Sequence, residues 1–580
     1  MTERGSGARA LPVFPAAPPP RRAARRTIAP GDQRVGEFRP EYRVLPRFYV
    51  WTLGCQMNRS DSEEMAGRLL AAGCAEASAM EDADLIVINT CAIRESAEAK
   101  VVGRQGVLAA LRERRPGLRI VLAGCAVREI DRGRLPRRFP AVDLFLRPDE
   151  EPELVDRLGL ASAQAGVGIA AAVGTATATI VNRTLVGAAD NLPATRASAV
   201  TAGAVHRASR IAAWLPIVYG CDKTCTYCIV PLTRGPERSR PFDEIVAEAR
   251  ALAADGYAEV TLLGQNVNSY GHDLPAEERF AHVEAERSVG RRIDRRARPD
   301  LAELLHAIDA IAGPDGRPAI PRLRFITSHP WDLSDRLVDA MAACRSVCEH
   351  LHLPVQSGDD AILRRMGRQY SVEHYLERLD RIRAAVPGIA MSTDVIVGFC
   401  GETEEQYEST LRLLEAVRYD QVFAAAFSPR PGTPAARLAD DVPPSVKRRR
   451  LNDLLALQEG IGLERNRAWV GRTVEVLVDQ AAPPPAQADD DPAGDVAPPP
   501  AHADDDPAGD AAAEAIDELD ARAASSSGSR PVPGSGEVRL AGRTRQGRLV
   551  HLVGSPGLVG RLVGVRIEHA GPFSLRGCLD

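Results

Sequence analysis

Lysine is almost absent from this chain of 580 residues, in which Lys100, Lys223 and Lys447 are the three lysines and arginine supplies nearly all of the 73 basic residues. Because alanine is abundant as well, we interpret this scarcity as compositional bias first and as a sign of phosphate recognition only second. The net charge is -5, but the acidic residues gather in one low-complexity segment near the C-terminus, and the rest of the chain is more basic. The charge therefore does not exclude a nucleic-acid partner.

Cysteines and long apolar runs are also scarce. Eleven cysteines are too few for a disulfide scaffold at this length, and their clustering favours metal binding in a reducing cytosol. No apolar stretch follows Arg21 and Arg22, so a twin-arginine export signal is excluded. The uncharged run of residues 158–181 consists mostly of Ala, Gly, Thr and Ser, which is typical of a linker and not of a membrane span. These absences predict a cytoplasmic protein without a membrane partner.

Three cysteines lie close together in the stretch GCDKTCTYCIVP, where Cys221, Cys225 and Cys228 have the spacing CxxxCxxC and the next cysteine is Cys344. Three thiolates in a short loop hold three irons of a 4Fe-4S cluster and leave one iron open to an outside ligand. Ferredoxin runs with a fourth cysteine and zinc sites with two separated ligand pairs do not match this spacing. With Tyr227 before the third cysteine, the loop resembles that of radical S-adenosylmethionine (SAM) enzymes. The alternative is three unrelated cysteines in a turn.

The N-terminal part alternates strands with helices. Strand-like runs at residues 48–53, 85–89 and 120–123 are separated by helical stretches, the first of which has a capping box at residues 60–63 and closes at Gly73. This pattern predicts an α/β fold with a doubly wound parallel sheet.

Each of these three strands ends at a cysteine. Cys55, Cys91 and Cys125 are 36 and 34 residues apart, about one βαβ unit each, so they are expected to meet at the carboxyl edge of one sheet. They form a predicted second three-cysteine site, although isolated cysteines at strands are often part of the core. Cys344 and Cys348 are predicted on the buried face of one helix.

The central part predicts an open, partial (β/α)6 barrel. Polar loops follow five consecutive strands and are expected to share one mouth. The charged run at residues 275–298 is interpreted as an inserted loop. The candidate strands are residues 215–219, 259–263, 323–326, 350–353, 390–397 and 421–428.

Seven motifs point to a family. YVWTLGCQMNRSDSE, NTCAIRESAEAKV, GCDKTCTYCIVPLTRGPERSRP, LLGQNVNSYG, LHLPVQSG, VGFCGET and SPRPGTPAA together resemble the radical SAM methylthiotransferases. The pairing of GCQMN with NTCAIRESA is similar to the tRNA 2-methylthio-N6-dimethylallyladenosine synthase branch. The branch for ribosomal protein reads GCxKN with NTCGF, and the branch for threonylcarbamoyladenosine reads GCKVN. Cys400 departs from the family, which mostly has proline there.

The resemblance implies a small all-β TRAM domain, an RNA-binding module, at the C-terminus. Its first strand is expected at residues 473–479, and an acidic insertion with a repeat of period 15 separates this strand from the rest. Arg543, Arg545 and Arg548 are candidates for phosphate contacts or are merely solvated. The expected domains are a disordered tail (1–46), the N-terminal methylthiotransferase domain (47–157), a linker (158–206), the radical SAM core (207–440), and a linker helix with the TRAM domain (441–580), whose disordered insertion spans about 481–535.

The resemblance also implies two 4Fe-4S clusters and SAM. The cluster on Cys221, Cys225 and Cys228 would cleave SAM to the 5′-deoxyadenosyl radical, and an auxiliary cluster on the other three cysteines would carry the sulfur. Ordinary turn and strand-end roles are the alternative for the remaining SAM-binding candidates. These are Tyr227, Gln265, Asp394, Gly398, Gly401 and Glu402.

The expected reaction is insertion of sulfur and a methyl group at C2 of N6-isopentenyladenosine next to the anticodon of tRNA. The base must leave its stack to react, which favours the single-stranded anticodon loop. A flavodoxin or ferredoxin is the expected electron donor, and a monomer is expected. A threonylcarbamoyladenosine or ribosomal-protein substrate is the alternative within the family. A non-catalytic iron-sulfur RNA-binding protein is the alternative outside it.

Overall fold

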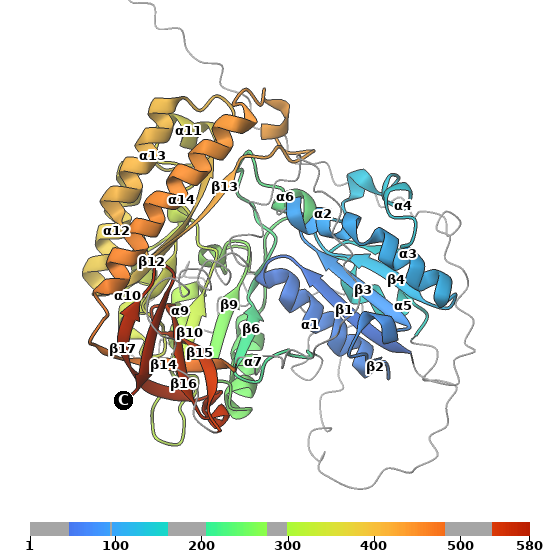
Figure 1. The fold of residues 1–580 in the computed structure, drawn as a ribbon, viewed down its shortest axis with the longest axis horizontal. Coiled ribbons are helices and arrows are strands. Elements are labelled where there is room, and N and C mark those ends of the chain that lie inside the picture. The colour runs from blue at the N-terminus through green and yellow to red at the C-terminus, as the bar shows by residue number, and fades with distance from the viewer. Residues whose placement is uncertain (1–45, 93–94, 161–204, 275–298, 482–535) are drawn as a thin grey trace, which may run out of the picture. The chain divides into compact units, whose positions relative to one another are not determined.

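The computed structural model describes residues 46–92, 95–160, 205–274, 299–481 and 536–580 (Figure 1). The predicted tail, linker, inserted loop and acidic insertion lie wholly or almost wholly outside these residues. Within the described ranges, no helix is long and apolar enough to cross a membrane.

The N-terminal domain contains a five-stranded parallel sheet. The strand order is the flavodoxin-like 2-1-3-4-5. The order in which strands are added to the sheet switches from one side to the other between the first and the third strand. All six residues of the LIVINT strand are buried, as expected for a central parallel strand covered on both faces. In sheet order, the strands are β2 (Ala75–Glu76), β1 (Arg47–Leu53), β3 (Leu85–Thr90), β4 (Arg119–Ala123) and β5 (Leu144–Leu146).

Helices cover both faces of this sheet, as the doubly wound prediction requires. Ile86 and Ile88 of β3 pack in one core with Val101 and Leu108 of the following helices. Asn89 points the other way, and its amide donates to the carbonyl oxygen of Asn58 on the first helix at 2.8 Å. The helices are α1 (Gln56–Ala71), α2 (Glu95–Gly103), α3 (Gln105–Arg114), α4 (Leu135–Arg138) and α5 (Leu154–Arg157).

The predicted start of α1 is wrong by about one turn. The helix begins at Gln56, directly after Cys55, and Asn58 Oδ1 accepts from the Cys55 backbone N–H at 3.4 Å. Ser60 and Glu63, the predicted capping pair, are buried inside the helix. No Ser, Thr or Asp marks the true N-terminus, so the usual capping signal was missing. The predicted end is confirmed, because Gly73 follows the helix with φ 87°.

The central domain contains six parallel barrel strands in two sheets, of order β10-β9-β6 and β11-β12-β13. A parallel bridge between Leu323 and Val347 joins the two sheets. Among the described strands, the two outermost barrel strands, β6 and β13, are not paired with each other, so the barrel is open. The strands are β6 (Ala212–Pro216), β9 (Glu259–Leu263), β10 (Arg322–Phe325), β11 (His350–His352), β12 (Ala390–Val397) and β13 (Gln421–Ala426).

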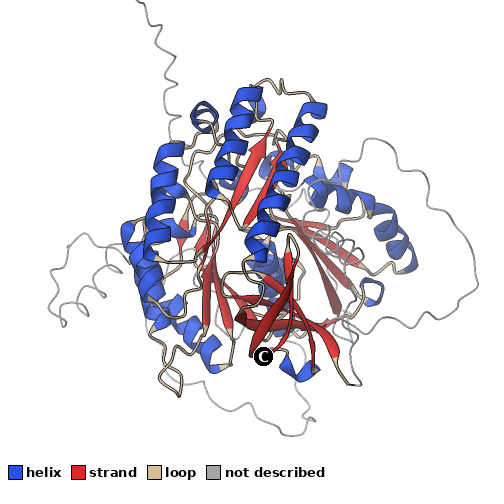
Figure 2. Cartoon of the chain, turned by 60° about the vertical axis from the view of Figure 1, so that its left-hand side comes forward, coloured by secondary structure: helices blue, strands red, loops and turns tan. Residues whose placement is uncertain are grey.

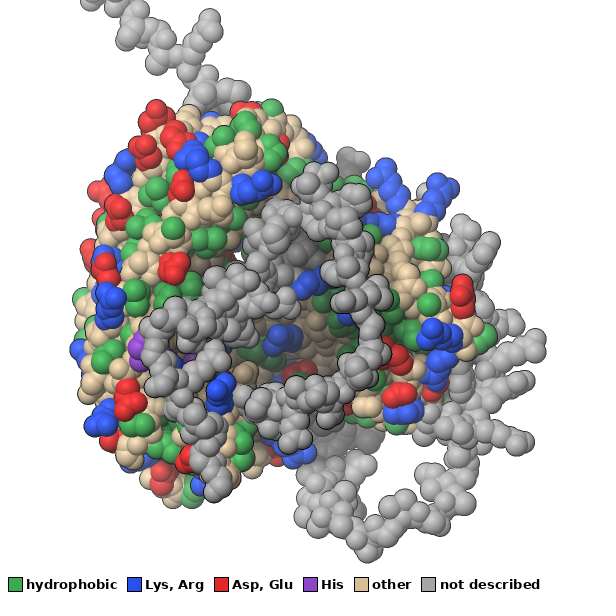
Figure 3. Space-filling model, viewed as in Figure 1, with side chains coloured by type: hydrophobic (Ala, Val, Ile, Leu, Met, Phe, Trp, Pro, Cys, Tyr) green, Lys and Arg blue, Asp and Glu red, His purple; other side chains and the backbone are tan. Residues whose placement is uncertain are grey.

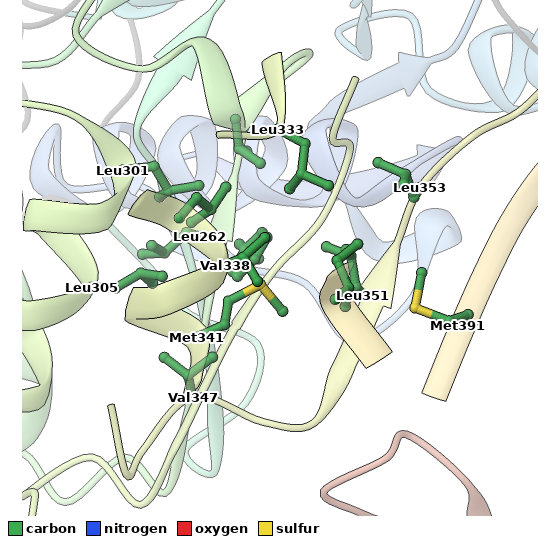
Figure 4. Close-up of a cluster of buried hydrophobic side chains, with 14 of the residues drawn as sticks. Leu262, Leu301, Leu305, Leu333, Val338, Met341, Val347, Leu351, Leu353 and Met391 are labelled. Carbon is green, nitrogen blue, oxygen red and sulfur yellow. The ribbon is translucent and has the colours of Figure 1, made fainter. Parts of the chain in front are cut away.

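The barrel helices lie outside the strands (Figure 2). Leu301 and Leu305 of α9 and Val338 of α10 pack on Leu262 and Leu351 of the strands, and this core holds the strand ends in place (Figure 4). The helices are α6 (Val230–Thr233), α7 (Phe242–Ala254), α9 (Leu301–Asp309), α10 (Asp335–Ala343), α11 (Asp360–Arg365), α12 (Val372–Ala385), α13 (Glu404–Val417) and α14 (Pro444–Arg467).

Two local predictions differ from the structure. The predicted strand 215–219 is divided, because β6 ends at Pro216 and the separate strand β7 (Val218–Tyr219) pairs antiparallel with β8 (Arg238–Ser239). Proline has no N–H to continue a ladder. Cys344 and Cys348 do not share a helix, because α10 ends at Ala343 and Cys348 lies in the next loop, although both side chains are buried.

The C-terminal domain is a closed five-stranded barrel of the size expected for a TRAM domain. Alternate residues of β16, Val550 and Leu552, are buried in its core, as the period-2 pattern predicts. The first two strands pair directly, up to Ala481 opposite Leu540, although residues 482–535 separate them in the chain. The barrel order is β14 (Thr473–Ala481), β15 (Val538–Thr544), β16 (Leu549–Gly554), β18 (Ser574–Leu579) and β17 (Leu562–Ala570).

Candidate functional site

The predicted polar loops all follow the carboxyl ends of barrel strands. Two of them contain non-glycine residues with positive φ, Thr327 after β10 (φ 70°) and Gln356 after β11 (φ 73°). Such a backbone is strained for a side-chain-bearing residue and concentrates at functional sites. These loops therefore define one specialised end of the barrel.

A glycine with positive φ precedes three of the six predicted ligand cysteines. Gly54 (φ 150°), Gly124 (φ 95°) and Gly220 (φ 75°) stand before Cys55, Cys125 and Cys221, respectively. A Cβ on Gly54 would lie 2.8 Å from the Cβ of Cys91, and one on Gly124 would lie 2.5 Å from the carbonyl oxygen of Thr90. The backbone thus turns sharply and closely at each of these cysteines, which only glycine permits.

The cysteines of the N-terminal domain come together at the carboxyl edge of its sheet. Cys55 follows β1, Cys91 follows β3 and Cys125 follows β4. The topological switch point, where sheets of this kind bind ligands, lies between β1 and β3. A hydrogen bond with Cys91 and the charge of a nearby arginine lower the pKa of Cys55 to about 6 against the effect of burial. Cys91 and Cys125 are buried, at 0% and 3% exposure.

The nearby arginine is Arg234, which directly follows α6 in the connection between β7 and β8 that also carries the other cysteine triad. Its Nε donates to Cys125 Sγ at 3.1 Å, and its Nη2 donates to Asp61 Oδ2 at 2.6 Å. Both charged side chains are buried, with 3% of Arg234 and 0% of Asp61 exposed. Ile229, at the start of the same short helix, packs against Cys125 and Ala92. One barrel loop therefore reaches the second cysteine site.

Two polar atoms beside this site lack a partner within the described part of the chain. Arg234 Nη1 and Thr90 Oγ1 are buried without a hydrogen bond. Buried donors normally have a hydrogen-bond acceptor, and a buried donor without one points to an acceptor from outside the protein. The sulfides and thiolates of a 4Fe-4S cluster are such acceptors. The residues present therefore fit a cluster held by these three cysteines.

The barrel cysteines lie in the loop between β7 and α6. The loop is fixed by Thr226, whose backbone N–H donates to the Met366 carbonyl at 2.8 Å and whose hydroxyl donates to the Arg365 carbonyl at 2.9 Å. Arg368 Nη1 donates to Cys225 Sγ at 3.4 Å. Burial raises the pKa of Cys228 to about 12, so a thiolate there needs the compensating charge of a bound metal. The donor set again fits an iron-sulfur cluster.

No three His, Cys, Asp or Glu side chains converge on a single metal ion in the described ranges.

Three of the predicted SAM-binding residues lie around the mouth of the barrel. Tyr227 is half-buried and packs against the core that includes Phe399. Gln265 Oε1 accepts from the Gly220 N–H at 2.5 Å, so it fixes the start of the cysteine loop. Asp394 on β12 has 39% of its side chain exposed and lies 3.4 Å from His352 Nε2.

The other three predicted SAM-binding residues form a turn after β12. Gly398 has φ 69°, and its N–H donates to Glu402 Oε2 at 2.6 Å. The Glu402 carboxylate also accepts from Arg450 Nη1 of α14 at 2.8 Å. Gly401 donates to Asp441 Oδ1 at 2.6 Å. The turn is thus held by the chain's own polar groups.

Two of the arginines considered for phosphate contact are engaged within the protein. Arg545 Nε lies 2.8 Å from Glu349 Oε2, and Arg548 pairs with the buried Asp420. Glu349 and Asp420 directly precede β11 and β13, at the amino ends of these strands. Arg543 is exposed, and among the described residues its side chain makes only a long hydrogen bond, 3.5 Å, to a carbonyl in its own hairpin. On the face drawn in Figure 3, basic and acidic side chains are interspersed where described residues are visible.

Sequence reasoning missed Arg234, Arg368 and Asp61. Arg234 and Arg368 each donate to a cysteine sulfur, but in a chain whose basic residues are nearly all arginine, nothing local distinguishes them. Asp61 is one carboxylate of the segment DSEE in α1, and only its partner 173 residues away reveals its role. The available signal was the neighbourhood of Arg234 in the motif LTRGPERSRP.

Comparisons with known proteins agree with this architecture. Residues 215–414 match the model of the Radical SAM superfamily, and residues 47–147 match that of the Uncharacterized protein family UPF0004. The tRNA-2-methylthio-N(6)-dimethylallyladenosine synthase of Carboxydothermus hydrogenoformans is 38% identical over 92% of this chain and 99% of its own length. The protein of that name from Geobacillus thermodenitrificans is 38% identical over 93% of this chain and 84% of its own length. Among solved structures, the radical SAM methyltransferase TsrM from Kitasatospora setae aligns with a TM-score of 0.45 and 15% identity over 68% of this chain and 74% of that chain, too distant a likeness to support a functional conclusion.

The open parallel barrel and its three-cysteine loop, together with the match to the superfamily, define a radical SAM enzyme. SAM and 4Fe-4S clusters are accordingly its cofactors. The chain belongs to the family of tRNA-2-methylthio-N(6)-dimethylallyladenosine synthases. The resemblance expected from the seven motifs is thereby confirmed.

Proposed function

We propose that this protein is a transferase that inserts sulfur and a methyl group at C2 of N6-isopentenyladenosine, next to the anticodon in tRNA. The observation that carries the proposal is the arrangement of two cysteine triads at the carboxyl ends of two parallel sheets, connected by Arg234. A single-cluster radical enzyme has no use for the second triad. Insertion of sulfur requires a second site, because the enzyme must bring a sulfur source to the substrate and must also remove a hydrogen atom from it.

The cysteines divide into two ligand sets. Cys221, Cys225 and Cys228 would hold the cluster that binds SAM, and Cys55, Cys91 and Cys125 would hold the auxiliary cluster. When bound, the clusters and SAM supply the one-electron chemistry that C2–H requires, because this bond is neither acidic nor electrophilic enough for acid-base catalysis.

The protein's own residues hold these sets in position. Gln265 fixes the amide of Gly220, Thr226 anchors the loop to the segment after α11, and Arg368 donates to Cys225. The Arg368 Nη2 also donates to the Pro354 carbonyl at 2.8 Å, so its guanidinium is immobilised. Such preorganised donors need no rearrangement during reaction.

We propose two roles for the six SAM-binding candidates. Tyr227, Gln265 and Asp394 lie around the barrel mouth and are the candidates for direct contact with SAM. Gly398, Gly401 and Glu402 act through the shape of the turn that closes β12, because their polar groups already have partners in the chain.

The proposed partner is the anticodon loop of tRNA, whose bases are accessible to a pocket without melting a helix. A flavodoxin or ferredoxin is the proposed electron donor. We propose that the protein acts as a monomer in the cytoplasm.

Nucleoside mass spectrometry tests the proposal. The full-length protein, reconstituted with iron and sulfide under anaerobic conditions, is incubated with isopentenylated tRNA, SAM and a reductant. We expect 2-methylthio-N6-isopentenyladenosine, and no methylthiolated product with the same tRNA lacking the isopentenyl group. Release of 5′-deoxyadenosine together with product only from threonylcarbamoylated tRNA or a ribosomal protein would contradict the substrate.

A further inference from the structure

Arg234 belongs to one domain by sequence and to the other by its contacts. It is six residues after Cys228 in the loop of the barrel triad. Its hydrogen bonds go instead to Cys125 Sγ, at 3.1 Å, and to Asp61 in α1, at 2.6 Å. The loop that would hold the SAM cluster thus places a positive charge at the auxiliary site.

Two opposite charges lie beside the auxiliary triad in the described part of the chain. The positive charge of Arg234 acts on both Cys55 and Cys125, and the negative charge of Asp61 acts on Cys125. Both side chains are almost completely buried. Charges in such a place are weakly screened by solvent and salt, so they act strongly on any group nearby.

One-electron reduction of a cluster adds a negative charge to a buried site. The reduction potential of a cluster depends on its net charge, on hydrogen bonds to its sulfurs and on its exposure to solvent. Arg234 contributes to two of these factors, because it brings a buried positive charge and donates to a ligand sulfur. Its Nη1 has no partner in the described chain and is free to donate once more.

We propose that Arg234 is a positioning residue that sets the reduction potential of the cluster held by Cys55, Cys91 and Cys125, an inference that rests on the proposed function. Arg234 stabilises the reduced form, and Asp61 limits this stabilisation. The barrel loop and the auxiliary cluster are thereby coupled, because a shift of the loop moves the charge that the cluster experiences.

Arg368 provides a contrast at the barrel triad. It also donates to a cysteine sulfur, Cys225, at 3.4 Å. However, its remaining donors go to the Tyr370 hydroxyl at 2.9 Å and the Pro354 carbonyl at 2.8 Å, and no carboxylate of the described residues pairs with it. The buried pair of a cation and an anion is thus a feature of the auxiliary site. Removal of either charge is expected to shift the reduction potential in opposite directions, and this difference can be tested.

The test is a redox titration of the full-length reconstituted protein with dithionite, followed by electron paramagnetic resonance. A Cys225→Ala background removes the barrel cluster, so that the auxiliary signal is observed alone. Arg234→Met removes the charge and the hydrogen bonds, Arg234→Lys keeps the charge, and Asp61→Asn removes the opposing charge. Thermal unfolding of each variant serves as a control for folding.

We expect Arg234→Met to lower the ratio of reduced to oxidised cluster at a fixed potential at least tenfold, which is about 59 mV for one electron. Asp61→Asn should shift the ratio in the opposite direction, and Arg234→Lys should shift it less than Arg234→Met. Shifts of the same sign in Arg234→Met and Asp61→Asn, as loss of packing would give, overturn the inference, as does a change below twofold in both. If Arg234→Met fails to retain iron, the directions in which Arg234→Lys and Asp61→Asn shift the ratio of reduced to oxidised cluster decide whether the inference holds. Absence of any cluster in the Cys225→Ala protein overturns the auxiliary assignment itself.

Discussion

At the scale of single residues, the site is defined by glycine-cysteine pairs. Three of the six predicted ligand cysteines follow a glycine with positive φ at the end of a strand. The positive φ of the glycine turns the chain sharply at the end of the strand, so that the cysteine stays at the carboxyl edge of the sheet. A side chain at such a glycine would strain the backbone and displace a neighbouring ligand loop.

Alanine at Gly124 tests this arrangement. We expect Gly124→Ala to lower the free energy of unfolding of the N-terminal domain by about 1–3 kcal/mol, because alanine is strained at positive φ. It should also lower the iron content of the Cys225→Ala protein. The control is Gly117→Ala, where an added Cβ has no atom within 4 Å. Equal losses in both variants, measured by thermal unfolding and iron analysis, would contradict the argument.

The two cysteine triads should differ in the step that they support. We expect Cys225→Ala to abolish the release of 5′-deoxyadenosine, and Cys91→Ala to retain part of it but to give no methylthiolated nucleoside. Chromatography of the small-molecule products and mass spectrometry of the tRNA separate the two effects. A methylthiolated product from Cys91→Ala would show that the auxiliary assignment is wrong.

The two cysteine triads could be proposed as ligand sets from the sequence because their spacing is a local property. CxxxCxxC is visible in eight residues, and a cysteine at the end of each of three strands follows from the βαβ repeat. Arg234 and Asp61 could not be predicted in this way. Their contact joins residues 173 positions apart, and each residue looks like an ordinary surface charge in its own segment.

At the scale of elements, α14 holds the turn that follows β12. Arg450 of this helix is 4% exposed and pairs with Glu402, which is 1% exposed, at 2.8 Å. Tyr407 of α13 also donates to the Arg450 carbonyl at 2.8 Å. The position of the turn therefore depends on a helix that precedes the TRAM domain in the chain.

A double-mutant cycle tests this ion pair. We expect Arg450→Met to destabilise the barrel by about 3–5 kcal/mol, because it leaves the buried Glu402 carboxylate without a charged partner. Glu402→Gln combined with Arg450→Met should cost less than Arg450→Met alone. Denaturant unfolding of the four proteins measures the coupling, and simple additivity of the two single changes would exclude it.

The same scale explains which elements were predictable. Strands such as LIVINT are continuous apolar runs and were found within one residue. The start of α1 was not found, because the residue at its N-cap is Cys55, which is not a standard capping residue. The division between β6 and β7 was missed because the antiparallel partner, β8, lies beyond the cysteine loop.

At the scale of the whole molecule, the TRAM barrel is joined to the amino ends of the barrel strands. Arg324 of β10 donates to the carbonyl oxygens of Thr544 and Arg545, both at 2.9 Å, and Arg545 pairs with Glu349. The cysteine loop follows the opposite, carboxyl ends. The amino end of such a barrel serves stability and the carboxyl end serves chemistry.

This division predicts different effects for two neighbouring arginines. Arg543→Gln should reduce the slope of log affinity for tRNA against log salt by about 0.7–0.9, the contribution of one lost phosphate contact. Arg545→Gln should leave the slope unchanged and lower the temperature of thermal unfolding. Binding titrations at several salt concentrations distinguish the two. A reduced slope for Arg545→Gln would mean that its pair with Glu349 opens on binding.

The direct pairing of β14 with β15 also has a practical consequence. Ala481 and Leu540 are partners in the ladder, so the ends of the two strands are about 5 Å apart, as any neighbouring strands are. New chain termini at this point leave every described hydrogen bond of the barrel intact, and so does a foreign domain placed between the two strands. The hairpin is therefore a natural position for circular permutation or for a fluorescent reporter that follows tRNA binding without touching either cysteine triad.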